Sequence, residues 1–359
     1  MTFLIAAAGT GGHVYPGLSV GEALVELGVD KSEIVYVGGD RLESVVYPGE
    51  GFRFLGIELA GLKRSLTLEN LKIPYVVARA RRAMTELIAG SGVRVVIGMG
   101  GYVTIPAALA ARKRRVAFYN AEQNAEAGLA NRITARWARE TFVSFPATAG
   151  LPYGRWVGNP VRRMFWEFDR PSLIGAARDH YELSKDVPTL GVFGGSLGAG
   201  VINDAVAGML ERWKGDRIDV VHLTGKSHLE SLGSRPGGRG VNWLRKAFEE
   251  RMDLFYAACD LVVARAGGAV AELTATGTPS VLIPGRFGST GHQAGNARVL
   301  EQAGAAVVID QDALAELAPT VQRLLPDVGL LAEMTTACGA IAKPEAALTI
   351  AGAMIEAAV

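Results

Sequence analysis

The sequence predicts an α/β protein with two doubly wound parallel sheets, each in a domain of its own. Apolar, strand-like runs alternate with helical stretches along the 359 residues, an order typical of parallel sheets covered by helices. Two glycine-rich turns follow strand-like runs about half a chain apart, at residues 9–13 and 194–200. Each is a loop between a strand and a helix, which aims backbone N–H groups at a phosphate. Two such loops indicate two nucleotide-type domains that face each other across a cleft.

The first half of the chain supplies one series of elements. Its expected strands span residues 3–8, 34–37, 54–57, 93–97, 116–119 and 140–143. Its expected helices span residues 18–27, 71–88 and 105–112. Several of these strands are continuous apolar runs, which suits parallel strands that helices cover on both faces. The series therefore predicts one parallel sheet, whose first strand leads into the first glycine-rich turn.

The second half supplies a similar series, which begins near residue 189. Its expected strands span residues 190–193, 219–223, 241–244, 261–264, 281–283 and 306–309. Its expected helices span residues 201–212, 252–258, 268–276, 295–303 and 312–325. The segment 158–162 lies between the two series and is the expected hinge. We therefore expect domains at 1–162 and 163–343, with an amphipathic helix over 344–358 that packs back on the first domain.

Composition excludes several classes of protein. Lys and Arg total 37 against 36 for Asp and Glu, and this balance is not that of a nucleic-acid binder. The two cysteines, Cys259 and Cys338, are far apart and lack metal-ligand spacing, so we expect free thiols in a reducing compartment. We find neither a signal peptide nor an apolar run of membrane-spanning length. We therefore expect a protein that is soluble or lies on a membrane surface.

His13 is the candidate catalytic residue of the first loop. It would lie at the start of a helix, where the partial positive charge disfavours the imidazolium form and leaves a neutral ring that accepts a proton. A capping or packing histidine is the alternative. The loop matches a dinucleotide fingerprint only in part, because Val14 occupies its third small position. A dehydrogenase is therefore disfavoured.

Three segments of the second half are candidate ligand contacts. The sequence around Ser196 fits the nucleophile elbow of hydrolases, but no oxyanion loop accompanies it. We therefore interpret this serine as a hydroxyl and N–H hydrogen-bond donor to a phosphate. Glu272 lies early in an expected helix and is suited to accept both hydroxyls of a ribose. A polar loop over 285–296 carries His292, Gln293 and Asn296. Its position after a strand predicts ligand contact.

In combination, the motifs resemble the MurG family of glycosyltransferases, from about residue 2 to the C-terminal helix. The matching segments are GTGGHVYPGL at 9–18, GMGGYV at 98–103, EQN at 122–124, GNPVR at 158–162, GGS at 194–196, RAG at 265–267 and HQ-x-x-N at 292–296. The resemblance implies a GT-B architecture, which is two Rossmann-like domains with an interdomain cleft. It implies that UDP-N-acetylglucosamine (UDP-GlcNAc) is the donor and binds mostly to the second domain.

The resemblance also implies a reaction. An inverting transfer moves GlcNAc from UDP-GlcNAc to the C4 hydroxyl of the muramyl sugar in undecaprenyl-diphosphate-linked muramyl-pentapeptide (lipid I). The product is lipid II, an intermediate of peptidoglycan synthesis, and hence of cell wall biogenesis, cell shape and cell division. Another GT-B transferase with a lipid or natural-product acceptor is the nearest alternative. A non-catalytic protein that binds nucleotide sugars is the alternative of a different class.

The resemblance assigns roles to individual residues. His13 matches the proposed general base. The implied donor-binding residues are Thr10, Gly11, Gly12, Asn124, Arg162, Gly195, Ser196, Asn203, Phe248, Glu272, His292 and Gln293. The implied acceptor-side residues are Tyr102, Glu122 and Asn124. The chain departs from the family at Ala121 (usually His), Leu197 (usually Gln), Gly200 (often Arg) and Glu249 (usually an apolar residue against the uracil).

The sequence also bears on metals and membranes. No Asp-x-Asp stands where a metal would be wanted, so we expect neither metal nor cofactor, with helix N-termini and N–H donors stabilising the leaving diphosphate.

Residues 59–82 interleave apolar side chains with basic ones, and 112–115 add four basic residues. Such a surface attracts anionic lipid, although a solvated helix face is the alternative. We expect a peripheral protein on the cytoplasmic face of the plasma membrane, with possible partners in cell-wall synthesis and division.

Overall fold

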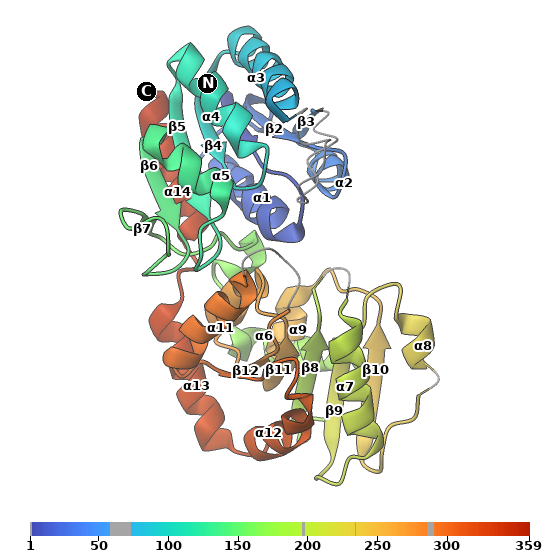
Figure 1. Ribbon diagram of the computed structural model, residues 1–359. Helices are drawn as coiled ribbons and strands as arrows, with labels where there is room; N and C mark the ends of the chain where they lie inside the picture. Colours follow the sequence, from blue (N-terminus) through green and yellow to red (C-terminus); the bar gives the residue numbers. More distant parts are fainter. Residues whose placement is uncertain (1, 58–72, 196–197, 234, 286–290) are drawn as a thin grey trace. The chain divides into compact units, whose positions relative to one another are not determined.

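The chain forms two compact units, shown in a computed structural model (Figure 1). The structure describes residues 2–57, 73–195, 198–233, 235–285 and 291–359. Unit 1 comprises Met1–Arg163 with Pro344–Val359, and unit 2 comprises Met164–Lys343. The C-terminal segment thus belongs to unit 1.

Unit 1 is built on a parallel sheet with the strand order β3-β2-β1-β4-β5-β6-β7. The strands are β1 (Thr2–Ala6), β2 (Ile34–Gly38), β3 (Arg53–Gly56), β4 (Val93–Gly98), β5 (Ala117–Glu122), β6 (Glu140–Val143) and β7 (Arg155–Trp156). Every pairing is parallel. The order reverses between β1 and β4. Ligands of such sheets bind at this reversal, outside the carboxyl ends of the strands.

Helices cover both faces of this sheet. They are α1 (Gly11–Glu26), α2 (Glu43–Gly49), α3 (Ile73–Gly90), α4 (Thr104–Arg114), α5 (Leu129–Thr134) and α14 (Ala346–Ala358). Met84 of α3 and Ala107 of α4 share a core cluster with Phe118 of β5. Neighbouring strand residues face opposite sides, and Tyr119 donates a hydrogen bond of 3.0 Å to the carbonyl of Ala353 on α14. Helices α14 and α1 pack against each other on that second face.

Unit 2 repeats the design with the parallel strand order β10-β9-β8-β11-β12-β13. The strands are β8 (Thr189–Phe193), β9 (Ile218–Leu223), β10 (Val241–Lys246), β11 (Leu261–Ala264), β12 (Ser280–Leu282) and β13 (Ala306–Val308). The helices are α6 (Arg170–His180), α7 (Gly200–Glu211), α8 (Leu229–Gly233), α9 (Met252–Ala258), α10 (Ala269–Ala275), α11 (His292–Gln302), α12 (Leu317–Leu324) and α13 (Val328–Ile341). The strand order reverses between β8 and β11.

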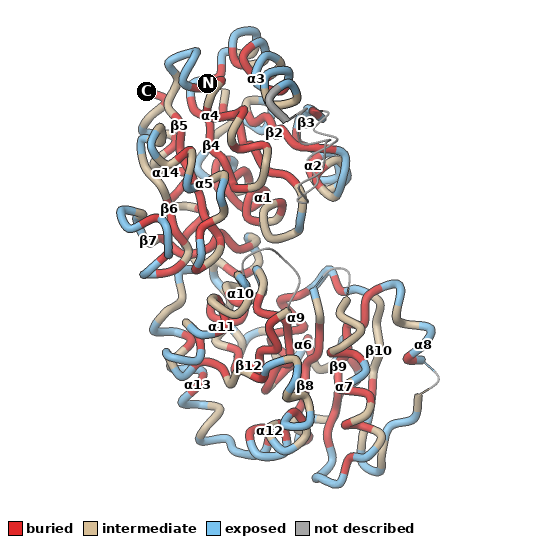
Figure 2. The backbone as a smooth tube through the Cα atoms, in the orientation of Figure 1, coloured by how far each residue is buried: buried red, intermediate tan, exposed pale blue. Residues whose placement is uncertain are grey.

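The core of unit 2 follows the strands and the inner faces of the helices (Figure 2). Val206 of α7 and Val321 of α12 pack on one face, against strand residues such as Val192. On the other face α9 approaches β8 closely. A Cβ at Gly191 would lie 2.6 Å from the Cys259 sulfur and 2.8 Å from the Phe255 ring, so only glycine fits at this contact.

Two sequence expectations need correction. Helix α1 begins at Gly11 rather than at residue 18, because packing overrides the weak helix propensity of its glycines and Pro16. Within the described chain, 328–358 also has the length and apolarity of a membrane span, although we expected no such stretch. The helix breaks inside it, since α13 ends at Ile341 and α14 begins at Ala346. The apolar face of α14 is buried in unit 1, so packing accounts for the composition of α14, whereas in α13 only Met334 and Cys338 are buried.

Candidate functional site

A buried carboxylate shapes the first glycine-rich loop. Gly9 follows β1 with φ of +106°, a conformation that L side chains rarely adopt. Its N–H donates to Glu43 Oε2 at 3.2 Å, and the N–H of Gly39, after β2, donates to Oε1 at 2.9 Å. Glu43 is fully buried. It therefore joins the loop after β1 to the loop after β2, a role that we did not predict.

His13 lies in the first turn of α1, where two loops of unit 1 meet. Its ring packs over Gly100, in the loop after β4. A Cβ at Gly100 would lie 2.8 Å from His13 Cδ2 and 2.9 Å from Nε2. Gly101 is equally close to the first loop, since a Cβ there would lie 3.0 Å from the carbonyl oxygen of Ala8. The two loops follow β1 and β4, the strands between which the strand order reverses. His13 therefore lies where a ligand of such a sheet is expected to bind.

Four other predicted residues of unit 1 lie at the start of α1 or in the neighbouring loop. Thr10 is the N-cap of α1, and Gly11 and Gly12 form its first turn, which carries no acidic residue. Tyr102 is half-buried, and its hydroxyl is 2.8 Å from the position of a Cβ on Gly39. Burial, followed by the nearby Glu43 charge, raises the pKa of Tyr102. The hydroxyl is thus a neutral hydrogen-bonding group at physiological pH.

Glu122 organises the loop after β5. Its Oε1 accepts hydrogen bonds from the backbone and side-chain N–H groups of Asn124, both at 3.0 Å. Its Oε2 accepts from the Gly128 N–H and the Asn131 amide, both at 2.9 Å. The carboxylate is buried and engaged by all four donors. Its geometry is that of a residue that positions Asn124, whereas the sequence predicted a residue lining the acceptor side.

Asn131 connects this loop to the His13 region. Its side chain is buried and also donates to the carbonyl of Ala121 at 2.9 Å. A Cβ at Gly100 would lie 3.4 Å from its Nδ2. Asn131 is thus a site-forming residue that sequence reasoning missed. The buried residues of its short helix α5 are both polar, Asn131 and Thr134.

The second glycine-rich loop folds tightly at the end of β8. A Cβ at Gly194 would lie 2.3 Å from the Ala199 nitrogen, and one at Gly198 would lie 2.2 Å from the carbonyl oxygen of Thr224. Gly195 has φ of +94°. Ser196, the predicted hydrogen-bond donor to a phosphate, lies outside the described residues. The loop leads into α7, which begins at Gly200.

Asn203 lies inside unit 2 and holds α7 to β9. Its Nδ2 donates to the carbonyl of Thr224 at 2.9 Å, and its Oδ1 is 3.0 Å from His222 Nε2. Burial lowers the pKa of His222 to about 3, so this ring is neutral. The Asn203 side chain is therefore engaged in the core, at a position where the sequence predicted a donor contact.

Glu272 lies in the first turn of α10, half-exposed. The buried Tyr256 donates its hydroxyl to Glu272 Oε2 at 2.8 Å. This bond fixes the carboxylate at the carboxyl edge of β11. Tyr256 is a second supporting residue that the sequence did not reveal, because it lies 16 positions away on another helix.

The loop after β12 and the start of α11 meet beside Glu272's helix. Gln293 Oε1 accepts from the Gly285 N–H at 2.7 Å. Asn296 donates to the carbonyl of Ala266 at 3.1 Å and is buried. His292 is the first residue of α11. These contacts bring the predicted residues His292 and Gln293 to the carboxyl edge of β11 and β12.

The two remaining predicted donor residues are Phe248 and Arg162. Phe248, in the loop between β10 and α9, is 44% exposed. Arg162 is half-exposed and lies near the end of the first segment of unit 1. Among the described residues, no group of three or more His, Cys, Asp or Glu side chains is arranged to hold a metal ion.

Comparisons with known proteins decide the family. Models of the glycosyltransferase family 28 N-terminal and C-terminal domains match residues 3–143 and 189–350. A UDP-N-acetylglucosamine--N-acetylmuramyl-(pentapeptide) pyrophosphoryl-undecaprenol N-acetylglucosamine transferase from Mycobacterium sp. (strain JLS) is 39% identical over 365 residues, covering 100% of this chain and 96% of the relative. The same transferase of Acidithiobacillus ferrooxidans (strain ATCC 53993 / BNL-5-31) is 37% identical, covering 99% and 97%. The chain belongs to the MurG family of glycosyltransferases.

Solved structures agree with the fold of this MurG family member. Acinetobacter baumannii MurG matches with a TM-score of 0.78 at 24% identity, covering 99% of this chain and 100% of that chain. The UDP-GlcNAc 2-epimerase from Neisseria meningitidis, bound to UDP-GlcNAc, matches with a TM-score of 0.68 at 12% identity, covering 99% and 100%. At these identities the likeness shows the fold alone. It confirms the predicted α/β class with two Rossmann-like, parallel-sheet domains.

Proposed function

We propose that this glycosyltransferase moves GlcNAc from UDP-GlcNAc to the C4 hydroxyl of the muramyl sugar of lipid I, with inversion, to form lipid II for peptidoglycan synthesis. The observation that carries the proposal is the identity to transferases of this name over the full chain. The geometry around His13 and Glu272 supports it. The His13 ring packs over the buried Gly100, and Glu272 accepts a hydrogen bond from the buried Tyr256, each after strands of a parallel sheet, where this chemistry needs them.

The reaction assigns His13 to the acceptor. The C4 hydroxyl attacks the anomeric carbon of GlcNAc while its proton passes to the neutral imidazole, and UDP leaves from the opposite face. The negative charge that develops on the diphosphate is stabilised by backbone N–H groups and the helix N-terminus of the second glycine-rich loop. These groups replace a metal ion in the proposed mechanism. Chelation with EDTA is therefore expected to leave turnover unchanged, and a loss restored by Mg²⁺ would contradict this part of the proposal.

The donor binds mainly to unit 2. Glu272, fixed by Tyr256, accepts hydroxyls of the ribose, and Phe248 meets the uracil. Gly195 and Ser196 bind the phosphates. His292 and Gln293 face the sugar. Asn203, which the structure buries, supports this site by holding α7 in place.

Residues of unit 1 complete the proposed complex. Five of them also bind the donor in this scheme: Thr10, Gly11, Gly12, Asn124 and Arg162. Tyr102 lines the acceptor side, and Glu122 acts there through Asn124 and Asn131. The buried bonds of Glu122 make it a positioning residue in this scheme.

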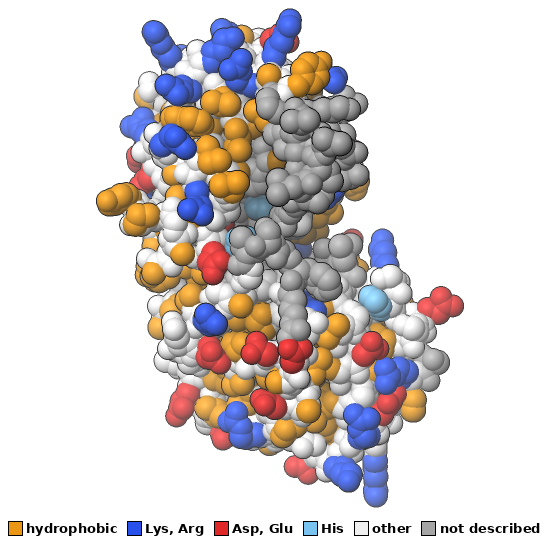
Figure 3. All heavy atoms as spheres, viewed as in Figure 1, with side chains coloured by type: hydrophobic (Ala, Val, Ile, Leu, Met, Phe, Trp, Pro, Cys, Tyr) orange, Lys and Arg blue, Asp and Glu red, His pale blue; other side chains and the backbone are white. Residues whose placement is uncertain are grey.

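The acceptor is lipid-linked, so we also propose that unit 1 rests on the cytoplasmic face of the plasma membrane. Helix α3 carries exposed Arg79, Arg81 and Arg82, and Tyr75 beside them is 72% exposed. Figure 3 shows Lys and Arg side chains gathered with hydrophobic ones over the end of unit 1 that carries α3 and α4. Part of the predicted segment 59–82, residues 59–72, lies outside the described residues.

Binding to vesicles tests this location. Vesicles with anionic lipid should retain the wild-type protein at low salt and release it as salt rises. Reversing the charges of Arg79, Arg81 and Arg82 should weaken the binding. Binding that is independent of salt, or no binding at all, would contradict the proposal.

The activity itself is tested by supplying UDP-GlcNAc with lipid I and measuring UDP and lipid II together. Equal amounts of both products support the proposal. Failure with lipid I, combined with turnover on another lipid or a natural product, would assign the chain to another GT-B transferase. UDP-GlcNAc binding without turnover on any acceptor would favour a non-catalytic binding protein.

A further inference from the structure

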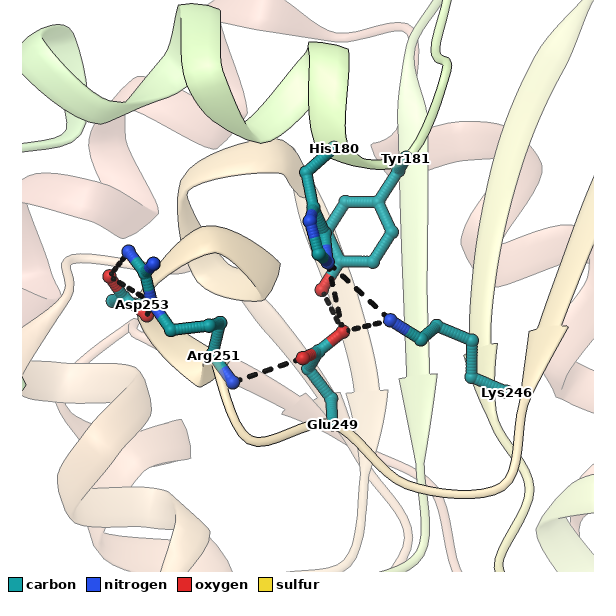
Figure 4. A network of polar contacts seen from close by, with 6 residues as sticks. All are labelled: His180, Tyr181, Lys246, Glu249, Arg251 and Asp253. Carbon is teal, nitrogen blue, oxygen red and sulfur yellow. Dashed lines mark hydrogen bonds and ion pairs between the residues drawn. The ribbon is translucent and has the colours of Figure 1, made fainter.

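A buried carboxylate fixes the loop between β10 and α9 in unit 2 (Figure 4). Glu249 lies in this loop and is 6% exposed. Its Oε2 accepts hydrogen bonds from Lys246 Nζ at 2.5 Å and from the Tyr181 hydroxyl at 2.9 Å. Its Oε1 accepts from the backbone N–H of Arg251 at 3.0 Å. One side chain thus joins the end of β10, the residue after α6 and the start of α9.

The network around Glu249 combines a charged partner, Lys246, with neutral hydrogen-bond donors. His180 Nε2 lies 3.4 Å from both Glu249 Oε2 and Lys246 Nζ. Burial alone raises the pKa of Glu249, but the hydrogen bonds from Lys246, the Arg251 N–H and Tyr181 outweigh it and hold the pKa at about 2. The group is therefore a carboxylate at neutral pH. Because it is buried, its loss leaves Lys246 and the Tyr181 hydroxyl without their acceptor.

The loop that Glu249 fixes is also bonded to the loop after β9, which lies against the second glycine-rich loop. The N–H of Thr224 donates to the carbonyl of Lys246 at 2.9 Å, and that of Gly225 donates to Ala247 at 3.0 Å. Thr224 is in turn the residue against which Gly198 packs. A continuous set of backbone contacts therefore runs from the Glu249 loop to the proposed phosphate loop.

The side chain next to Glu249 points outward. Phe248 is 44% exposed although its neighbour is buried, so the network holds an aromatic ring at the surface. An exposed aromatic ring suits a planar base, which gains on the order of 1–3 kcal/mol from stacking. A base bound here would belong to the same nucleotide whose diphosphate lies at the second glycine-rich loop.

We propose that Glu249 is a positioning residue for nucleotide recognition: with Lys246 and Tyr181 it holds the 247–251 loop so that Phe248 meets the base of the donor. The inference rests on the proposed function, because it takes the donor to be a uridine nucleotide. It assigns a task to the position where the sequence departs from the apolar residue of its family. An ion-paired carboxylate fixes the loop here.

The test measures UDP and ADP affinity by calorimetry for the full chain, with kcat and KM for UDP-GlcNAc. Glu249→Gln should weaken UDP binding about tenfold, an energy of about 1.4 kcal/mol, and raise the donor KM similarly. At saturating donor, kcat should stay within about twofold, because a binding contact is lost equally in the ground and transition states. The preference for UDP over ADP should narrow. A structural role alone would lower the unfolding temperature and leave this preference intact.

Two further variants complete the design. Glu211→Gln is the matched control, since Glu211 is paired with Arg235 in the same unit at 2.6 Å but lies at the far end of α7; it should leave UDP affinity unchanged. Lys246→Met should reproduce the defect, and it carries the test if Glu249→Gln does not fold. Unchanged affinity and base preference in the folded variant would overturn the inference. Absence of UDP binding by the wild type would instead overturn the proposed function.

Discussion

Replacing Gly100 with alanine should displace His13 from its working position. The added Cβ would lie 2.8 Å from His13 Cδ2 and 2.9 Å from Nε2, whereas carbon atoms in contact prefer about 3.5–4.0 Å. The ring must therefore move by roughly 0.6–1.2 Å. A displacement of about 1 Å in a reacting group can lower the rate on the order of 100-fold. We expect kcat for lipid II formation to fall by that factor, with little change in the KM for UDP-GlcNAc.

The same substitution also strains the backbone, so a control must separate the two effects. Gly100 has φ of +90°, and alanine in such a conformation costs about 1–3 kcal/mol of stability. Gly92 has φ of +63°, and a Cβ there would meet nothing within 4 Å. Gly92→Ala should therefore lose similar stability and keep full activity. Urea unfolding and steady-state kinetics on both variants measure the two effects separately.

A double variant identifies the cause of the loss. In a protein that already carries His13→Ala, the methyl group of Gly100→Ala has no ring to displace. The two substitutions should therefore be non-additive in kcat. If Gly100→Ala keeps wild-type kcat, or lowers kcat further in the His13→Ala background, the reasoning is refuted.

Three other predictions concern buried polar groups. Tyr256→Phe removes the hydrogen bond that fixes Glu272. The KM for UDP-GlcNAc should rise about five- to tenfold, the effect of a hydrogen bond worth about 1–1.5 kcal/mol, while kcat stays unchanged. An unchanged KM would count against a ribose-binding role for Glu272. Glu122→Gln turns an –NH₂ group toward two donors and should lower the free energy of unfolding in urea by about 2–4 kcal/mol. The control Glu126→Gln, at an exposed position, should change this free energy little. Equal losses in the two variants would contradict the Glu122 network. The pKa of Glu249 falls from 4.5 to about 2 on folding, so its contribution to stability is complete above about pH 5 and disappears as pH falls toward 2. The difference in unfolding temperature between wild type and Glu249→Gln should shrink over that range, and a constant difference would contradict the ion pair.

The fold was predictable from the sequence because its signals are local. Continuous apolar runs mark the buried parallel strands, and glycine-rich turns mark the starts of α1 and α7. The limits appear where packing overrides local preference. Helix α1 includes Gly11, Gly12 and Pro16, which sequence reasoning leaves outside a helix. The separate helix α14, by contrast, was predicted over 344–358 and is observed at Ala346–Ala358.

The candidate site was predictable only in its outline. Motifs indicated His13 and Glu272, because their residue types and neighbours point to proton transfer and ribose binding. The partners that hold them were not predictable, since Tyr256 and Gly100 are far away in sequence. Burial also changes the meaning of a motif residue, as for Glu122, whose oxygens are engaged by the protein itself. Such relations depend on which loops the sheet brings together.

The central claim is that His13 takes the proton of the lipid I hydroxyl during GlcNAc transfer. Its most direct test is the single-turnover rate of lipid II formation with saturating UDP-GlcNAc and lipid I, for wild type and for His13→Ala. We predict that the variant binds UDP-GlcNAc with unchanged affinity and reacts about 10²–10⁴ times more slowly, the usual contribution of a general base. Equal rates for the two proteins, or no lipid II from the wild type, would contradict the account.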